Sequence, residues 1–276
     1  YHLTRAGEVG MAEPRAATGV AQELFRLCRV ESVAALRSWV EPDSAEFAAV
    51  ICELAALDGS LGWLAALSGV SVRGSGSVRD GRLNGRWEWV VGARSAELLR
   101  LSLPDGVEAV VPAAAARIEP ADGLAALDGA RVCAVTVDDV PVADVRPVDP
   151  RTVAGAAAAV VGSADGVWRS HVDRVRARLT VSHGGDEVTD DAAAQVARAA
   201  SDIDAARLQV VTALDDGPGM RAWRFRQAVA RAHGAADRLL ANSRHALDAA
   251  DPVSMRWRDV QAGRRLADAL LLGRPC

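Results

Sequence analysis

The chain has 276 residues, 50% of them hydrophobic, and a formal net charge of −4, so it can bury a sizeable core in one to three domains. Because it carries no basic excess to neutralise phosphates, we expect no nucleic-acid partner. The longest apolar run, residues 153–162, is too short to cross a bilayer, and the N-terminus lacks a signal-peptide layout. We therefore expect a soluble, cytoplasmic protein with no membrane partner.

Residues 15–68 are predicted to be helical. Apolar side chains recur every three or four positions between Val20 and Leu36, the spacing of one helix face. A second helix is expected after residues 42–44, where the sequence Pro-Asp-Ser supplies an N-cap. Gly59 interrupts the helical pattern near the far end of this segment.

Residues 69–150 alternate apolar and polar side chains and are punctuated by glycine, which predicts strands. Asp80–Gly81 and Asn84–Gly85 are turn dipeptides. Further strands are expected within residues 96–104, 107–113 and 130–148, with residues 119–123 as a separator. This zone is interpreted as a small antiparallel sandwich or barrel.

Residues 152–273 return to helical periodicity, with four amphipathic segments joined by short links. Thr189 is the expected N-cap of the second segment, Pro218 lies at the start of the third, and Gly273 closes the fourth. We predict an α+β fold with an N-terminal helical region (1–68), a middle β domain (69–150) and a C-terminal four-helix bundle (151–276).

Two residue types limit the possible chemistry. The chain contains no lysine, because all 32 of its lysine-plus-arginine residues are arginine. A lysine Schiff base and a P-loop lysine are therefore excluded. The cysteines at 28, 52, 133 and 276 form no CxxC pair, so we expect buried thiols and no metal site.

Four stretches of the chain resemble, in the same order, segments of the acyl-CoA dehydrogenase superfamily. They are ELAALDGSLGW (53–63), DGRLNGRWEWVVGA (80–93), the segment 171–207 that ends in ASDIDAAR, and DPVSMRWRDVQAG (251–263). Within the superfamily the chain looks closest to the branch of two-component flavin-dependent monooxygenases. The resemblance implies helices, then a β domain, then four helices, with a cofactor slot at their junction.

The resemblance also implies a flavin cofactor, FAD or FMN. Arg178 and Gln195 match family positions that reach the flavin phosphates or ring, often across a subunit boundary, and arginine suits pyrophosphate. Trp87 resembles a flavin-adjacent aromatic residue of the hairpin, and Trp63 a residue of the ligand pocket. Each has a plainer alternative: a solvated helix-end arginine, or tryptophan packing in a core.

The chain departs from the family pattern in three places. It is shorter, and Val91 stands where the family has the serine of its hairpin. The position of the family's catalytic carboxylate falls near Ala267; Asp268 is one residue, or 100° of helix rotation, away. The monooxygenase branch carries a histidine in this helix, and none follows His245 here. The catalytic residues are therefore unknown, and RWRD (256–259) is expected to form structural ion pairs.

Three functions remain open. The chain is an acyl-CoA dehydrogenase-like flavoprotein that lacks its own base and works with a partner, or the oxygenase component of a two-component monooxygenase, or a flavin-free helical scaffold. The C-terminal helices are expected to form a homo- or hetero-oligomer. An acyl thioester or an aromatic small molecule is the expected ligand.

Overall fold

The computed structural model describes residues 45–121, 126–181, 187–241, 248 and 250–272. Three predictions lie outside these residues: the helix before residue 42, the N-cap of the next helix at residues 42–44, and the end of the last helix at Gly273. Two short helices come first, α3 (Ala45–Leu57) and α4 (Gly59–Leu67). Asp58 caps α4, because its side chain accepts a hydrogen bond from the Leu61 amide at 3.1 Å. The helical pattern is interrupted at Gly59, where α4 begins.

The expected hairpin consists of β1 (Ser71–Arg79) and β2 (Arg82–Val90). Asp80 and Gly81 form its turn, both with left-handed φ, 51° and 72°. The other predicted turn, Asn84–Gly85, is wrong: these residues continue β2. A side chain on Gly85 would lie 2.6 Å from the Trp87 ring, so this glycine makes room for that ring rather than for a turn.

Five more strands follow the hairpin: β3 (Leu98–Ser102), β4 (Val107–Pro112), β5 (Arg117–Pro120), β6 (Cys133–Pro141) and β7 (Asp144–Pro147). The strands form two antiparallel sheets, one ordered β1-β2-β6-β5 and the other β3-β4-β7. Strand β5 lies partly in residues 119–123, which the sequence suggested as a separator between strands.

Four long helices follow the strands: α5 (Pro150–Val181), α6 (Asp190–Thr212), α7 (Pro218–Ala241) and α8 (Pro252–Leu272). The Thr189 hydroxyl accepts a hydrogen bond from the Ala192 amide at 3.2 Å, which confirms the predicted cap of α6. Pro218 is the first residue of α7, as predicted.

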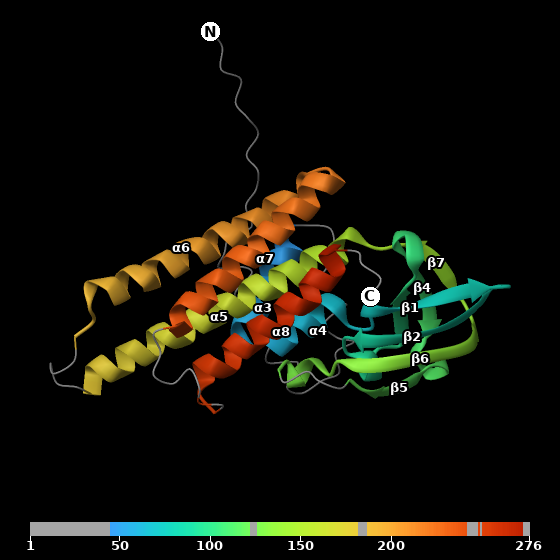
Figure 1. Ribbon diagram of the computed structural model, residues 1–276, viewed down its shortest axis with the longest axis horizontal. Coiled ribbons are helices and arrows are strands. Elements are labelled where there is room, and N and C mark those ends of the chain that lie inside the picture. The colour runs from blue at the N-terminus through green and yellow to red at the C-terminus, as the bar shows by residue number, and fades with distance from the viewer. Residues whose placement is uncertain (1–44, 122–125, 182–186, 242–247, 249, 273–276) are drawn as a thin grey trace, which may run out of the picture.

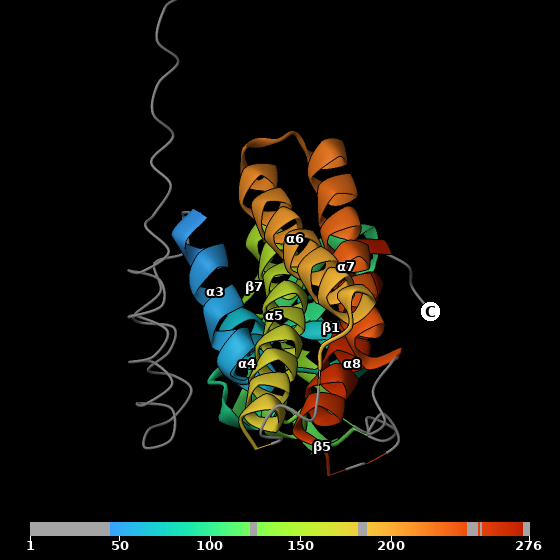
Figure 2. The same cartoon turned by 90° about the vertical axis from the view of Figure 1, so that its left-hand side faces the viewer.

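The helices before and after the strands share one hydrophobic core, with α3 and α4 packed directly on α5. The strands enclose a second core of their own and lie at one end of the helical body (Figures 1 and 2). The α+β class with antiparallel sheets is therefore confirmed.

Gly162 of α5 allows close contact with α3, and its replacement by alanine is expected to destabilise the protein by about 1–3 kcal/mol. An added Cβ would lie 2.1 Å from the backbone oxygen of Cys52, an atom that cannot move away without shifting α3. Gly234→Ala in α7 is the matched control, because its nearest neighbour would be 3.9 Å away. There the better helix propensity of alanine should stabilise by about 0.5–1 kcal/mol. Chemical denaturation of both variants checks the opposite signs.

Candidate functional site

A cavity of about 690 Å³ opens between α5, α6 and α7. Its lining is mostly apolar, with Trp168 at one wall; the Trp168 indole N–H donates to the backbone oxygen of Val196 at 3.2 Å and ties α5 to α6. Arg178 from the end of α5 and Gln195 from the first turns of α6 both line it. Two of the predicted cofactor residues are thus brought to one place. The size and apolar character are those of a small-molecule site.

The polar lining of the cavity is mainly basic. Arg176, Arg178 and Arg238 line it, and Glu187 contributes the acidic side chain. Arg238 pairs with Asp202 through a terminal nitrogen, and its buried Nε has no hydrogen-bond partner among the described residues. The three arginines around an open cavity fit a ligand that brings an anionic group.

His171 also lines the cavity, and its pKa is lowered. Burial is the largest cause, followed by the positive charges of Arg174 and Arg178. Burial and the neighbouring arginines therefore favour the neutral imidazole, which can accept or donate one hydrogen bond at the cavity wall.

The cavity lies far from the strands. Arg178 is near the far end of α5, about 40 Å along the helix from its beginning at the β module, given a rise of 1.5 Å per residue. Figure 1 shows this end of α5 and the start of α6 on the side opposite the strands. Trp87, the cofactor residue predicted in the hairpin, therefore lies at the opposite end of α5 from Arg178.

The two predicted tryptophans are fully buried elsewhere. Trp87 lies in the core of the β module, where its indole N–H donates to the backbone oxygen of Ser102 at 2.8 Å. Trp63 lies in the helical core against Gly263 of α8, and its indole N–H has no partner among the described residues. Both placements match the plainer alternative of core packing, and contact with a cofactor stays a prediction for both.

The backbone amides that follow the Trp hairpin are already engaged. The Val91 amide donates to Val70 at 3.1 Å, and the Gly92 amide donates to Ala130 at 3.1 Å. Val91 itself is fully buried. In this conformation neither N–H is available to a flavin ring, so the ring end of the implied cofactor does not fit here, whereas the basic cavity fits its phosphates.

The last helix presents no carboxylate at the family's base position. Ala267 is buried, while the Asp268 side chain is 42% exposed and pairs with Arg264 at 3.4 Å. The structure therefore separates the two residues onto different faces of α8, as the helical rotation requires.

In the RWRD segment of α8, Arg256 and Asp259 hydrogen-bond to backbone groups, in addition to the expected electrostatic attraction between the two side chains. Arg256 donates to the backbone oxygens of Ala56 and Leu57 at 2.9 and 3.0 Å and so caps the end of α3. Asp259 accepts the Leu127 amide at 2.8 Å. The segment thus fastens α8 to α3 and to the turn before β6.

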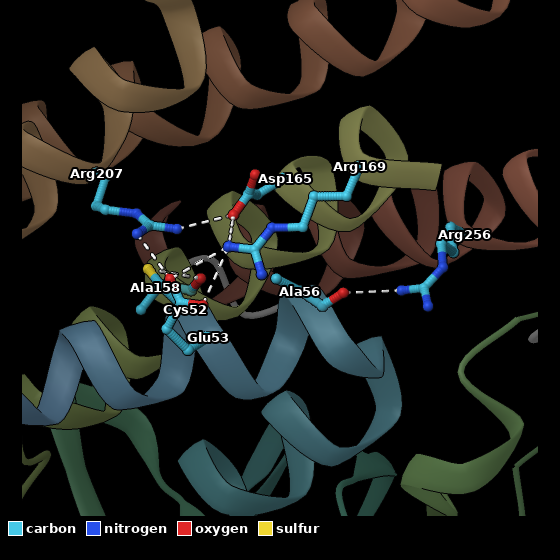
Figure 3. Close-up of polar contacts among 8 residues, drawn as sticks. All are labelled: Cys52, Glu53, Ala56, Ala158, Asp165, Arg169, Arg207 and Arg256. Carbon is cyan, nitrogen blue, oxygen red and sulfur yellow. Dashed lines mark hydrogen bonds and ion pairs between the residues drawn. The ribbon is translucent and has the colours of Figure 1, made fainter. Parts of the chain in front are cut away.

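A group of four charged side chains, the charge cluster, joins α3, α5 and α6 (Figure 3); its two acids are buried, while the side chains of Arg169 and Arg207 are 38% and 27% exposed. Arg207 donates to Glu53 at 2.8 Å and to Asp165 at 2.9 Å, and Arg169 donates to the same two acids at 3.0 and 2.6 Å. The Glu53 side chain is 5% exposed. Two acids and two arginines balance, which is the condition for burying such charges.

The charge cluster was not predicted from the sequence, although a signal was present. Glu53 is the first residue of ELAALDGSLGW, and Arg207 is the last of ASDIDAAR, two of the stretches that carry the family resemblance. Cys52 lies beside it, with its thiol donating to Ala158 at 3.3 Å. Burial raises the pKa of this thiol to about 12, so Cys52 is an inert core residue.

Within the described residues, no three His, Cys, Asp or Glu side chains are grouped as a metal ion would require. No helix in the same part of the chain has both the length and the apolar character needed to span a membrane.

Comparison with known proteins identifies sequence relatives of this chain. No protein-family model matches. The oxygenase subunit HsaA of a flavin-dependent monooxygenase from Rhodococcus jostii is 28% identical over 246 residues, covering 69% of this chain and 64% of the relative. The Mycobacterium tuberculosis HsaA is 34% identical over 124 residues, or 39% of this chain and 32% of the relative. The chain thus spans less than two thirds of the length of these relatives.

Several solved structures have a fold similar to that of this chain over nearly its whole length. The HsaA monooxygenase from M. tuberculosis superposes with a TM-score of 0.69 at 21% identity, covering 92% of this chain and 93% of that one. A glutaryl-CoA dehydrogenase from Mycobacterium smegmatis in complex with FADH2 superposes with a TM-score of 0.66 at 10% identity, covering 96% of each chain. The chain therefore has the fold of the acyl-CoA dehydrogenase superfamily and is similar in sequence to flavin-dependent monooxygenase oxygenase subunits, which confirms the resemblance seen in its sequence.

Proposed function

We propose that this chain is a flavin-binding subunit of an oxidoreductase, and that the cavity between α5, α6 and α7 receives the phosphate end of FAD or FMN. The observation that carries this proposal is the meeting of Arg178 and Gln195 in one cavity whose polar lining is mainly basic. Similarity to flavin-dependent oxygenase subunits supports the same assignment. We also propose three regions, 1–68, 69–150 and 151–276, in the order helical, β and helical.

The distance between the cavity and the hairpin implies a second subunit. A flavin phosphate held by Arg178 would place its ring against another chain, because the hairpin of the same chain lies beyond the other end of α5, a helix more than about 40 Å long. We infer a homo- or hetero-oligomer assembled through the C-terminal helices, in which each flavin touches two chains. Arg178, Arg238 and Gln195 would bind and orient the phosphates with charge-assisted and neutral hydrogen bonds.

The chemistry of the last helix favours an oxygenase role over acyl-CoA dehydrogenation by this chain alone. A dehydrogenase of this type needs a carboxylate to take the α-proton of an acyl thioester, and position 267 carries alanine. A bound flavin supplies redox chemistry of its own, which a hydroxylating subunit uses without that proton abstraction. An aromatic small molecule is therefore the favoured substrate class, and a base-lacking partner subunit of a dehydrogenase is the alternative.

Flavin uptake tests the proposal directly. The full chain, purified and incubated with FAD or FMN in oxidised and reduced form, should retain flavin through gel filtration and show flavin absorbance. Protein that stays colourless and takes up neither cofactor would support the flavin-free scaffold instead. Hydroxylation of aromatic substrates when a flavin reductase is added supports the oxygenase role. Co-purification with a longer relative that carries the base supports the partner-subunit role.

Arg178→Ala is expected to weaken flavin retention about tenfold or more, the scale of one charge-assisted hydrogen bond. Arg198→Ala is the matched control, because Arg198 is exposed on α6 and is absent from the cavity lining. Equilibrium titration by flavin fluorescence compares the two variants with the unmodified chain. Equal affinities in all three would remove Arg178 from the site.

A further inference from the structure

A histidine lies among arginines in the wall of the cavity between α5, α6 and α7. His171, Val175 and Arg178 all line this cavity, and their spacing of four and three residues places them on one face of α5. The His171 side chain is half-buried, so a ligand in the cavity can reach its ring. Within the described residues, burial and two positive charges act on this imidazole, and no hydrogen bond does.

Charged side chains on several helices surround His171, and most of them are arginines. Arg174 and Arg178 of α5 act on the imidazole directly. Arg176 of α5 and Arg238 of α7 are the other positive residues of the lining, and Glu187, just before α6, is the negative one. The nearest charges are thus those that repel a second positive charge.

Acidic partners offset three of these arginines without reaching His171. The pairs are Arg174 with Asp251, which directly precedes α8, Arg238 with Asp202 of α6, and Arg176 with Asp173 of α5. Each acid is engaged by its arginine, and none of the three lines the cavity. An anion brought into the cavity would therefore be the negative charge that the imidazole can contact.

We propose that His171 takes up a proton when an anion binds in this cavity, and that anion binding therefore strengthens as the pH falls. A protonated imidazole donates from both ring nitrogens, so it adds a charge-assisted hydrogen bond to those of the arginines. The inference rests on the proposed function for the natural ligand, a flavin phosphate. Proton uptake with a simple anion does not require flavin.

The sign of the pH effect follows from the surroundings of the ring. Burial, and then Arg174 and Arg178, lower the pKa of His171 and favour the neutral form. A negative charge within about 4–6 Å acts in the opposite direction and raises the pKa. Arginine and glutamate side chains ordinarily keep their charges between about pH 5.5 and pH 8, so histidine is the lining residue type that changes charge there.

Sulfate is a suitable probe, because it keeps two negative charges across this range, whereas a phosphate ester titrates near about pH 6. The full chain is titrated with sulfate by NMR at constant ionic strength, since salt screens exposed charges. A rise of one pKa unit corresponds to a tenfold factor, so sulfate should bind about tenfold more tightly near pH 5.5 than near pH 8. The imidazole signals of His171 should titrate at higher pH when sulfate is present.

His171→Gln keeps a hydrogen-bonding side chain that does not titrate, and its sulfate affinity should not change with pH. His233→Gln is the matched control and should keep the tenfold effect. His233 of α7 is absent from the cavity lining, and its Nε2 lies 2.8 Å from the side-chain oxygen of Gln261 in α8.

Three results would overturn the proposal: a His171→Gln chain with the full pH effect, a His171 titration that sulfate leaves unchanged, or sulfate that fails to bind even near pH 5.5. Flavin retention without any sulfate binding would contradict the proton-linked anion site and leave flavin binding in place. Sulfate that binds with the expected pH effect, but is displaced by neither FAD nor FMN, would contradict the proposed function and leave the proton uptake established.

Discussion

Replacing Glu53 with alanine is expected to lower the free energy of unfolding by about 2–4 kcal/mol, because this buried carboxylate accepts charge-assisted hydrogen bonds from two arginines that are themselves partly exposed. The change leaves two arginines, Arg169 and Arg207, sharing the single carboxylate of Asp165 inside the junction of α3, α5 and α6. Urea denaturation of the purified chain gives the measurement.

Glu119→Ala is the matched control for the charge cluster. Its partner Arg117 is 75% exposed and Glu119 itself 41% exposed, so this surface pair should contribute about 0–1 kcal/mol. A double-mutant cycle combining Glu53→Ala with Arg207→Met isolates the coupling between the two residues. A loss at Glu53 no larger than the loss at Glu119 would show that the charge cluster does not hold the helices together.

Trp87→Ala should cost about 3–5 kcal/mol in protein that contains no flavin, as for other buried aromatic truncations. The ring fills the β core, and the backbone oxygen of Ser102 would lose its indole donor. Trp89, two residues on and only partly buried with Arg73 stacked 5.1 Å from its ring, is the control and should cost clearly less.

This comparison separates packing from cofactor binding. A Trp87→Ala chain that unfolds at the same denaturant concentration as the unmodified protein, but loses flavin, would assign the ring to the cofactor and not to the core.

The sequence predicted the ends of helices and the hairpin turn well where these features depend only on neighbouring residues. Thr189 and Pro218 mark the starts of α6 and α7 because caps act within one helical turn. The hairpin turn at Asp80–Gly81 follows from two left-handed residues in succession. Asn84–Gly85 has the same local chemistry but lies within a strand, because β2 continues its pairing with β1 and β6 there and Gly85 makes room for the Trp87 ring.

The candidate site was only partly accessible from sequence for the same reason. Arg178 and Gln195 were predicted through the family resemblance, and the structure places both at one cavity. The pairing of Glu53 with Arg207 could not be predicted, because the two residues are 154 positions apart and each is an ordinary amphipathic-helix charge in its own segment. The burial of Leu127 and Ala130 in the helical core, at the turn before β6, was not predicted either. Nothing in the local sequence distinguishes a surface loop from one that enters a core.

The shared core of early and late helices has a consequence for how the protein is made. At about 5–20 residues per second, the ribosome needs roughly 8–30 seconds after Glu53 to deliver Arg207. During that interval the apolar face of α3 and its carboxylate have no completed environment, while the strands between them are already able to pair. Nascent α3 is therefore exposed to aggregation during this interval, and a holding chaperone would protect it best if it acted before α6 is synthesised.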